Sequence, residues 1–198
     1  MKSTNVMHVT HLVSPHERWH MQGHRGGVMW LTGLPASGKK VLASVLATRL
    51  FKDGIEVYTL DSVKIRGSLS SDLGFSRNDR RENIRRAAEL AAIMARSGLV
   101  VIAAFIAPYA EDRARARSVA ENFHEIFLDM PLELCEARDK DDRYTRARKG
   151  YVSNFTGISA PYEVPDNPEV TLSLQEIDSG SACDILVEYV KKHFVNFT

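Results

Sequence analysis

Short apolar runs alternate with amphipathic segments along the 198 residues of this chain. Residues 28–32 (Val-Met-Trp-Leu-Thr) form a mostly apolar run that is typical of a strand buried on both faces. A turn that carries glycine follows, and residues 39–52 then place leucine and valine at helical spacing. Residues 99–106 are the most apolar β-like run in the chain. The pattern therefore predicts a buried strand, a helix and a second buried strand in its first half.

The rest of the chain continues this alternation. We expect further strands at 55–60, 123–128 and 170–174, helices at 79–96, 110–122 and 182–194, and a helix start near Pro131. Residues 138–155 are dense in charge and poor in core-forming side chains, which is typical of a mobile loop or a helical lid. Apolar strands that alternate with helices predict an α/β fold, with a parallel sheet covered by helices on both faces.

An N-terminal arm at 1–24 precedes the single domain that we place at 25–198. The arm carries five of the seven histidines, at positions His8, His11, His16, His20 and His24. Their spacing fits no standard zinc pattern, and no cysteine joins them. We therefore favour a polar arm that lies on the surface over a metal site, and we assign no metal ligands.

Composition and charge narrow the class of protein. Lysine and arginine number 26 against 25 aspartates and glutamates, which excludes a strongly basic nucleic-acid binder but leaves a local basic patch open. The two cysteines, Cys135 and Cys183, lie far apart in the sequence, which favours reduced thiols. No apolar run approaches the ~20 residues of a membrane span, and the N-terminus shows no signal pattern. We expect a cytoplasmic protein without nucleic-acid or membrane partners.

The strongest motif lies between the first strand and the first helix of the domain. It reads Gly33-Leu34-Pro35-Ala36-Ser37-Gly38-Lys39 and matches G-x-x-x-x-G-K, in which backbone N–H groups and the helix N-terminus cradle phosphates. Lys39 would then reach the β- and γ-phosphate oxygens. An ordinary turn between strand and helix is the alternative, and the strand–turn–helix context favours phosphate binding over it.

The next position departs from this motif. The pattern requires serine or threonine there, because the hydroxyl helps to hold Mg²⁺, but this chain has Lys40. At about 4 Å and an effective dielectric of about 20, an ammonium repels a divalent cation by several kcal/mol unless its side chain swings away. We therefore expect phosphate binding to survive better than metal binding.

Several further motifs resemble the adenylyl-sulfate kinase family, from about residue 25 to residue 169. They are the segments 30–34 (WLTGL), 72–75 (DLGF), 79–86 (DRRENIRR), 135–139 (CEARD), 155–158 (FTGI) and 161–163 (PYE). Enzymes of this family transfer a phosphoryl group from ATP to the ribose 3′-hydroxyl of adenosine 5′-phosphosulfate (APS). The product is 3′-phosphoadenosine 5′-phosphosulfate (PAPS), made during sulfate activation. The resemblance implies a P-loop kinase fold with a lid and a homodimer.

The resemblance also implies site residues. Residues 33–40 and Arg138 would bind ATP, Lys39 and Asp61 would be catalytic, and residues 143–150 would form the lid. Arginine and asparagine would hold the ribose and phosphosulfate of APS, aromatic rings would sandwich its adenine, and two neighbours would complete the pocket: Arg66, Phe75, Arg80, Asn83, Ile106, Pro108 and Phe155. Without the resemblance, the two phenylalanines would be core residues and the arginines of 80–86 a solvated helix face.

Three positions depart from the family pattern where metal and phosphoryl group would lie. The family has Asp-Gly-Asp-Asn after its second strand, and this chain has Asp61-Ser62-Val63-Lys64, so Val63 replaces the second aspartate. The family's lid lysine falls at Asp141, and Lys40 replaces the hydroxyl residue. The resemblance implies Mg²⁺ as a cofactor, yet its protein ligands are largely missing. Side chains two apart on an extended segment face the same way, so Asp61 could replace the lost carboxylate. Lys40 could itself neutralise phosphate charge.

Three functions follow from these residues. The first is APS phosphorylation with APS and ATP as substrates. The alternative is a catalytically impaired member that binds APS or PAPS and regulates a partner such as ATP sulfurylase. The third keeps the fold and changes the acceptor to another nucleotide or sugar hydroxyl, and the retained Phe75, Arg80 and Phe155 count against it.

Overall fold

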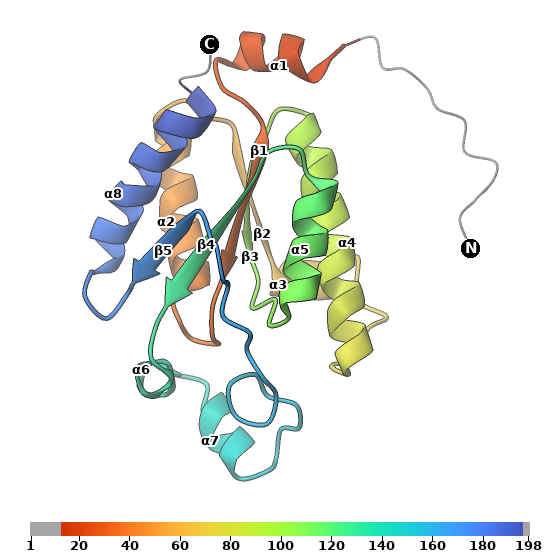
Figure 1. The fold of residues 1–198 in the computed structure, drawn as a ribbon, viewed down its shortest axis with the longest axis vertical. Helices are drawn as coiled ribbons and strands as arrows, with labels where there is room; N and C mark the ends of the chain where they lie inside the picture. Colours follow the sequence, from red (N-terminus) through yellow and green to blue (C-terminus); the bar gives the residue numbers. More distant parts are fainter. Residues whose placement is uncertain (1–12, 196–198) are drawn as a thin grey trace, which may run out of the picture.

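A five-stranded parallel sheet forms the centre of the computed structural model, which describes residues 13–195 (Figure 1). The strand order is β2-β3-β1-β4-β5, and every neighbouring pair is parallel. The strands are β1 (Gly27–Thr32), β2 (Val57–Asp61), β3 (Val100–Ala104), β4 (Phe123–Asp129) and β5 (Val170–Ser173). The α/β fold class expected from the sequence is confirmed.

Helices cover both faces of the sheet. Helices α2 (Lys39–Lys52) and α8 (Ser179–Val190) pack on one face, and α4 (Arg77–Arg96) and α5 (Ala110–Val119) pack on the other (Figure 1). Near the carboxyl ends of the strands lie α3 (Ser62–Arg66), α6 (Leu132–Ala137) and α7 (Arg143–Arg148), while α1 (Pro15–Gln22) lies at the opposite end. A π-helical turn, η1 (Lys191–Val195), extends α8. No helix within residues 13–195 is long and apolar enough to cross a membrane.

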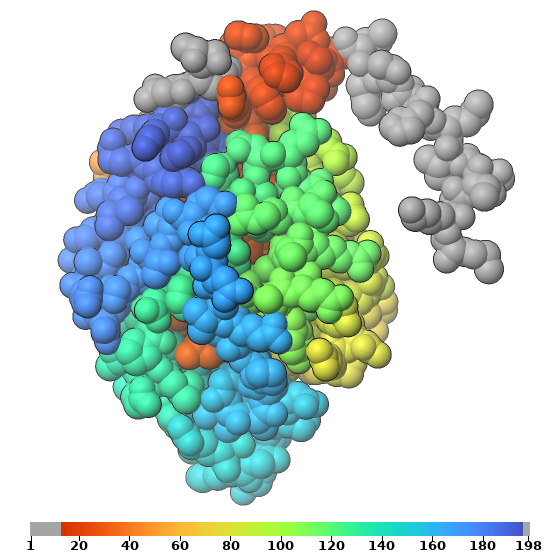
Figure 2. Space-filling view, viewed as in Figure 1, coloured from red at the N-terminus to blue at the C-terminus, as the bar shows by residue number. Residues whose placement is uncertain are grey.

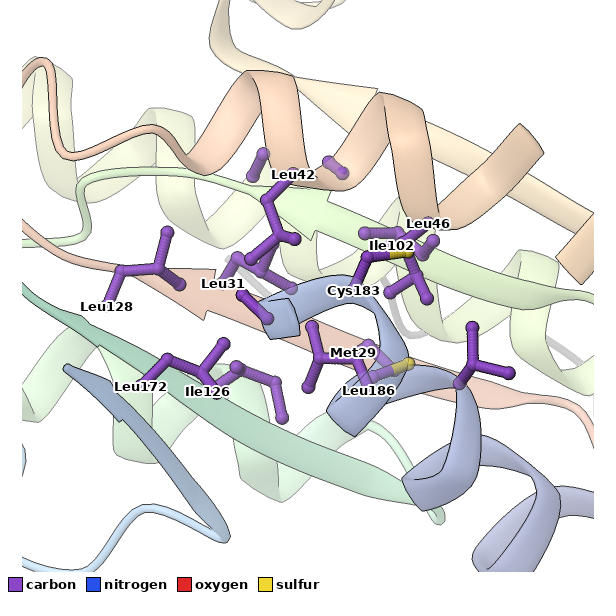
Figure 3. Close-up of a cluster of buried hydrophobic side chains, with 14 of the residues drawn as sticks. Met29, Leu31, Leu42, Leu46, Ile102, Ile126, Leu128, Leu172, Cys183 and Leu186 are labelled. Carbon is purple, nitrogen blue, oxygen red and sulfur yellow. The ribbon is translucent and has the colours of Figure 1, made fainter. Parts of the chain in front are cut away.

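The alternation of side chains along the strands builds two cores. Met29 and Leu31 of β1 point toward α2 and α8, where they join a cluster with Leu46 and Leu186 (Figure 3). Trp30 points to the other face and stacks on Phe105 at 5.1 Å between ring centroids. Because both faces of the central strand are buried, its near-continuous apolar run follows from the packing.

The chain that follows α7 closes the front of the molecule. In the space-filling view, the light-blue segment before β5 runs upward between the green α5 and the blue α8 (Figure 2). The hydroxyl of Tyr162 in this segment lies 2.9 Å from the Thr32 hydroxyl at the end of β1. The segment is thereby fixed against the carboxyl edge of the sheet.

The edge strand β2 differs from the expectation that all strands are buried throughout. Of its five residues only Leu60 is buried, and Tyr58 is 46% exposed. The strand lies at the end of the sheet order, so one face and one hydrogen-bonding edge have fewer neighbours.

Several helix boundaries also differ from the expected ranges, and two of these differences have a clear local cause. Helix α5 ends at Val119 instead of residue 122, because Ala120 adopts an extended conformation. Helix α8 begins at Ser179 instead of 182, because the Asp178 carboxylate accepts hydrogen bonds from the amides of Gly180 and Ser181.

Helix α1 lies within the segment predicted as an arm without regular structure. Its N-terminus is a capping box, in which Ser14 and Glu17 each bind the other's backbone amide and Pro15 occupies the first turn. The sequence Ser-Pro-His-Glu was the signal that would have found this helix.

The histidines of the predicted arm fall into different environments. His24 is buried, and its Nε2 accepts the backbone N–H of Glu56 at 3.0 Å. His8 and His11 lie outside the described residues. Between residues 13 and 195 no group of three or more histidine, cysteine, aspartate or glutamate side chains is placed to hold a metal ion.

The first core makes a direct test of this packing possible. Replacing the fully buried Leu46 by alanine is expected to lower the free energy of unfolding by about 2–5 kcal/mol, because the change leaves a cavity between α2 and the sheet. Val45→Ala, at the exposed neighbouring position of the same helix, is the matched control and should change it by less than about 1 kcal/mol. Denaturant titration measures both, and equal losses would contradict the packing described above.

Candidate active site

The loop between β1 and α2 has the backbone shape of a phosphate cradle. Gly33, Ala36 and Gly38 all have positive φ angles, of 151°, 60° and 93°. A Cβ atom on Gly33 would lie only 2.7 Å from the carbonyl oxygen of Leu128 on β4, so glycine is required there. The loop leads directly into α2, whose first N–H groups have no partner within the helix itself and can therefore bind an anion.

Lys39 is folded into this loop. Its ammonium donates hydrogen bonds to the carbonyls of Gly33 at 2.8 Å and Leu34 at 2.7 Å, and to the hydroxyl of Ser37 at 3.1 Å. The pKa of Lys39 is lowered to about 7, mainly because the side chain is buried; Cys135 raises the pKa, and the positive charge of Arg143 lowers it, by smaller amounts. A phosphate group in the loop would supply the negative charge that this ammonium lacks.

A large cavity lies beside the loop, between α3, α4 and the chain that follows α7. Its volume is about 870 Å³, which is within the usual size of a small-molecule site. The wall includes Pro35 of the phosphate loop, so the cavity and the loop are continuous. All seven residues predicted to hold the acceptor line it: Arg66, Phe75, Arg80, Asn83, Ile106, Pro108 and Phe155.

Two of the cavity arginines are fixed by hydrogen bonds to the chain around them. Arg80 donates to the Phe75 carbonyl at 3.0 Å, to the Thr156 hydroxyl at 3.0 Å and to the Asn154 carbonyl at 2.5 Å. Arg66 donates to the Gly74 carbonyl at 2.8 Å, and its guanidinium lies 4.3 Å above the Phe75 ring. Both arginines are partly buried, and this burial lowers the pKa of each. Partly dehydrated guanidinium groups bind phosphate or sulfate oxygens strongly.

Asn83 places a buried polar atom at the cavity wall. The side chain is only 3% exposed, yet its Oδ1 has no hydrogen-bond partner within the described part of the chain. Buried polar atoms in native proteins are almost always hydrogen-bonded. A ligand hydroxyl or amino group in the cavity would satisfy this oxygen.

Neither phenylalanine is a fully buried core residue, although Phe155 packs against the first core. Phe75 is 65% exposed, and Phe155 lies partly buried on the cavity wall, where its ring meets Tyr144 edge-on at 4.9 Å between centroids. Both rings are therefore available to a planar ligand. Their stacking on adenine stays a prediction.

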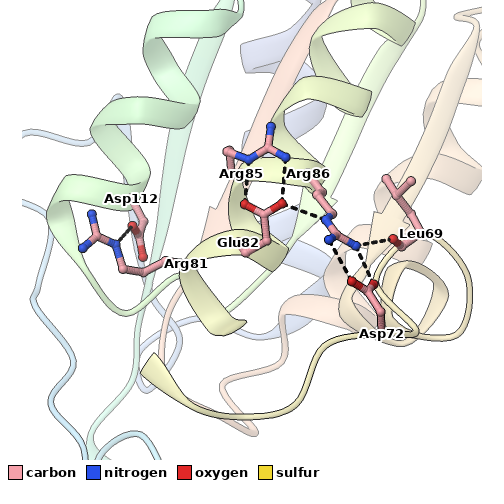
Figure 4. Close-up of polar contacts among 7 residues, drawn as sticks. All are labelled: Leu69, Asp72, Arg81, Glu82, Arg85, Arg86 and Asp112. Carbon is pink, nitrogen blue, oxygen red and sulfur yellow. Dashed lines mark hydrogen bonds and ion pairs between the residues drawn. The ribbon is translucent and has the colours of Figure 1, made fainter. Parts of the chain in front are cut away.

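Three other arginines of α4 form ion pairs with nearby carboxylates and do not line the cavity. Arg81 pairs with Asp112 of α5, Arg85 pairs with Glu82, and Arg86 pairs with Glu82 and Asp72 (Figure 4). These side chains form the charged outer face that the alternative interpretation predicted. Arg80 differs from them, because it lines the cavity.

The charged segment 138–155 was expected to be either a mobile loop or a helical lid. It contains the helix α7 (Arg143–Arg148), which agrees with the second of these forms. Tyr144 of α7 is buried, and its hydroxyl donates to the Pro35 carbonyl at 2.8 Å, which ties the lid to the phosphate loop. Arg143 lines the cavity and is held by Asp139 at 2.7 Å. Arg143, Tyr144 and Thr156 are not among the site residues that were predicted individually from the sequence. The one signal was the position of the first two at the start of the predicted lid.

A second, smaller hollow lies on the other side of the phosphate loop. It encloses about 200 Å³ and is lined by Gly38, Leu42 and Arg138, together with residues at the start of α8. Arg138 was predicted to lie near the ATP base, and this hollow places it next to the loop. Its contact with a base stays a prediction.

The structure separates the residues expected around a divalent ion. Asp61 caps α3, because its Oδ1 accepts the amides of Val63 at 2.8 Å and Lys64 at 2.9 Å. Its Oδ2 faces the ammonium of Lys40 at 3.8 Å. Residues 62–66 are helical, so the expectation of an extended segment with Asp61 and Val63 on the same side is wrong. The cap is the physical reason, because it turns the chain directly after the strand.

The donor set at this position does not fit Mg²⁺. An ammonium stands where a hydroxyl ligand is needed, and the only carboxylate of the 61–64 segment already has both oxygens engaged. Val63, 67% exposed, contributes an apolar surface to the cavity wall. Asp141 is exposed and lies 3.6 Å from Arg143, so it reduces positive charge at the lid. Within residues 13–195 the cavity wall includes Ser62 and Val63 but not Asp61.

The comparisons with known proteins agree with this geometry. Residues 25–173 match the sequence profile of adenylylsulphate kinase. The chain belongs to the adenylyl-sulfate kinase family. It is 42% identical over 193 residues to adenylyl-sulfate kinase of Clostridium acetobutylicum, an alignment that covers 97% of this chain and 96% of the relative.

Solved structures of adenylyl-sulfate kinases are also similar. The APS kinase CysC of Mycobacterium tuberculosis, solved in complex with AMPPNP and APS, superposes with a TM-score of 0.81 at 38% identity. That match covers 84% of this chain and 98% of the other. A hexameric APS kinase of Thiobacillus denitrificans gives a TM-score of 0.66 at 28% identity, covering 87% of this chain and 31% of that one.

The lowered pKa of Lys39 leads to a test of the phosphate loop. At pH 8.5 most Lys39 side chains of the free protein are neutral, because their pKa is about 7. Bound phosphate raises this pKa, so nucleotide binding at pH 8.5 should take up close to one proton, and binding at pH 6 should take up almost none. Calorimetry in buffers of different ionisation enthalpy measures this uptake.

The control for this test is Lys39→Arg, which stays protonated at both pH values. Its nucleotide binding should show no proton uptake at pH 8.5. An equal uptake by the variant and the unaltered protein would mean that another group titrates.

Proposed function

We propose that this chain is an adenylyl-sulfate kinase, which transfers the γ-phosphoryl group of ATP to the 3′-hydroxyl of APS and releases ADP and PAPS. The observation that carries this proposal is that all seven predicted acceptor residues line one and the same cavity beside the phosphate loop. The names of the relatives support the same substrates. The reaction belongs to sulfate activation.

The cavity fits an acceptor that is both anionic and aromatic. Arg66 and Arg80 present guanidinium groups to the phosphosulfate, and the open Oδ1 of Asn83 can accept a hydrogen bond from a ribose hydroxyl. Phe75 and Phe155 can stack on a purine, at about 1–3 kcal/mol for each ring. Another acceptor hydroxyl would have to use the same combination of charge and rings.

The donor nucleotide lies in the phosphate loop. Its phosphates bind the amides at the start of α2 and the ammonium of Lys39, and its base lies toward Arg138. In the reaction the 3′-oxygen forms the new bond to Pγ, the bond from Pγ to the β–γ bridging oxygen breaks, and ADP leaves with those electrons. We assign the proton of the hydroxyl to Asp61, the residue that the resemblance makes catalytic. Its Oδ2 is not used by the α3 cap, but it faces Lys40 at 3.8 Å and would have to leave this contact to accept the proton.

A second candidate function is binding of APS or PAPS without turnover, with regulation of a partner such as ATP sulfurylase. The specific observation that favours it is the pair between Lys40 and Asp61, together with the apolar Val63 beside it. Phosphoryl transfer depends on positioning and on charge stabilisation, and these residues remove metal-supporting groups.

Assembly and location complete the proposal. We propose a homodimer, a prediction from the resemblance, and size-exclusion chromatography with light scattering tests it. We also propose a cytoplasmic location. The two described cysteines, Cys135 and Cys183, are buried thiols, which suits a reducing compartment.

A pair of adjacent arginines tests the acceptor site. Arg80→Met is expected to raise the Kd for APS at least tenfold, because charge-assisted hydrogen bonds contribute about 1.5–3 kcal/mol each. Arg81→Met removes the same charge one residue later, on the outer face, and should leave the Kd within about twofold. Calorimetry measures binding, and chromatography of APS and PAPS after incubation with ATP measures turnover. Failure to bind APS and to form PAPS would overturn the proposed function, whereas binding without PAPS would select the second candidate.

A double reversion separates slow turnover from none. Lys40→Ser combined with Val63→Asp restores a hydroxyl and a carboxylate at the two positions, and should raise PAPS formation with Mg²⁺ present by about 100-fold or more. Either single variant is the control for additivity. If the unaltered protein is already as fast as the double variant, the two substitutions have no catalytic cost.

A further inference from the structure

Lys40 lies at the N-terminal end of α2, the end at which a helix can bind an anion. It follows Lys39 directly and lies in the first turn of the helix, whose free N–H groups are where phosphates bind. Its side chain is 68% exposed, and its ammonium lies 3.8 Å from the carboxylate of Asp61 at the end of β2. The charge of Lys40 is therefore placed between a carboxylate and the site of the phosphates.

The contacts of Asp61 show how the ammonium of Lys40 could stand in for a bound Mg²⁺. One carboxylate oxygen is used by two backbone amides of α3, and the other faces the Lys40 ammonium at 3.8 Å. In P-loop proteins generally, a hydroxyl at the position of Lys40 helps to hold the Mg²⁺ that bridges β- and γ-phosphate oxygens. Here the same place holds a cation that is part of the chain, with an acidic partner behind it.

We propose that Lys40 takes over the role of the divalent cation in nucleotide binding. Its ammonium bridges the polyphosphate and Asp61, so the protein binds metal-free ATP at least as tightly as the magnesium complex. The proposal rests on the proposed function for the identity of ATP as the nucleotide, and it concerns binding rather than turnover. Two positive charges, on Lys39 and Lys40, then face the phosphates from one loop.

The long contact between Lys40 and Asp61 suits this role. At 3.8 Å, and with a lysine side chain that is 68% exposed, this ion pair adds little to stability, so the flexible lysine is free to turn toward a phosphate. A magnesium complex of ATP would bring a divalent charge against this ammonium, and the like charges repel each other. Mg²⁺ is therefore expected to weaken binding or leave it unchanged.

Calorimetry of ATP binding in the absence of APS tests the proposal. For the unaltered protein, the Kd measured with excess EDTA should equal or lie below the Kd measured with excess Mg²⁺. Lys40→Ser should weaken metal-free binding by about tenfold or more, and Mg²⁺ should then strengthen binding by at least fivefold. Lys40→Ala should lose metal-free affinity in the same way and gain little from Mg²⁺, because it offers no hydroxyl.

The matched control is Lys52→Ser, the same exchange at the exposed far end of α2. It should bind like the unaltered protein in both conditions, and thermal unfolding of each variant checks that the fold is kept. Mg²⁺ that strengthens ATP binding to the unaltered protein, or Lys40→Ala with full metal-free affinity, would overturn the proposal. These results would leave the proposed function standing, since PAPS formation is measured separately. No ATP binding in either condition would overturn both.

Discussion

The ammonium of Lys39 has little contact with solvent, and the loop around it must present oxygen atoms to keep it hydrogen-bonded. Two backbone carbonyls and a hydroxyl do so, and this holds residues 33–38 in a shape that includes left-handed backbone at Ala36. The same shape leaves the amides at the start of α2 free. The loop, the helix and the strand that feeds it are thus organised around one buried charge.

The parallel sheet brings the other site residues to the same edge as the phosphate loop. Because all five strands run in the same direction, Asp61 at the end of β2, Ile106 after β3 and the phosphate loop after β1 meet at one edge. Helix α4 then adds Arg80 and Asn83 from one of its faces and an ion-paired outer surface from the other. One face of this amphipathic helix therefore lines the cavity, and its other face carries ion-paired side chains on the outside of the protein.

The sequence predicted the buried parts of the fold well, because apolar runs and helical spacing record burial directly. Strands β1 and β3 and helix α2 agree with the predicted elements closely. Helices α1 and α3 were missed from the sequence, because local hydrogen bonds fix both of them: the capping box of α1 and the Asp61 cap of α3. The acceptor residues came from the resemblance, since spacing alone left Phe75 open as a core residue. Arg143 and Tyr144 went unassigned, because their positions depend on how the lid packs against residues far away in the sequence.

The hydrogen bond from Tyr144 to Pro35 gives the lid a second meaning. This hydrogen bond joins α7, which borders the large cavity, to the phosphate loop. An outward movement of α7 would break it and leave the Pro35 carbonyl without this donor. The position of the lid and the shape of the phosphate loop are therefore joined by one contact between residues 109 positions apart in the sequence.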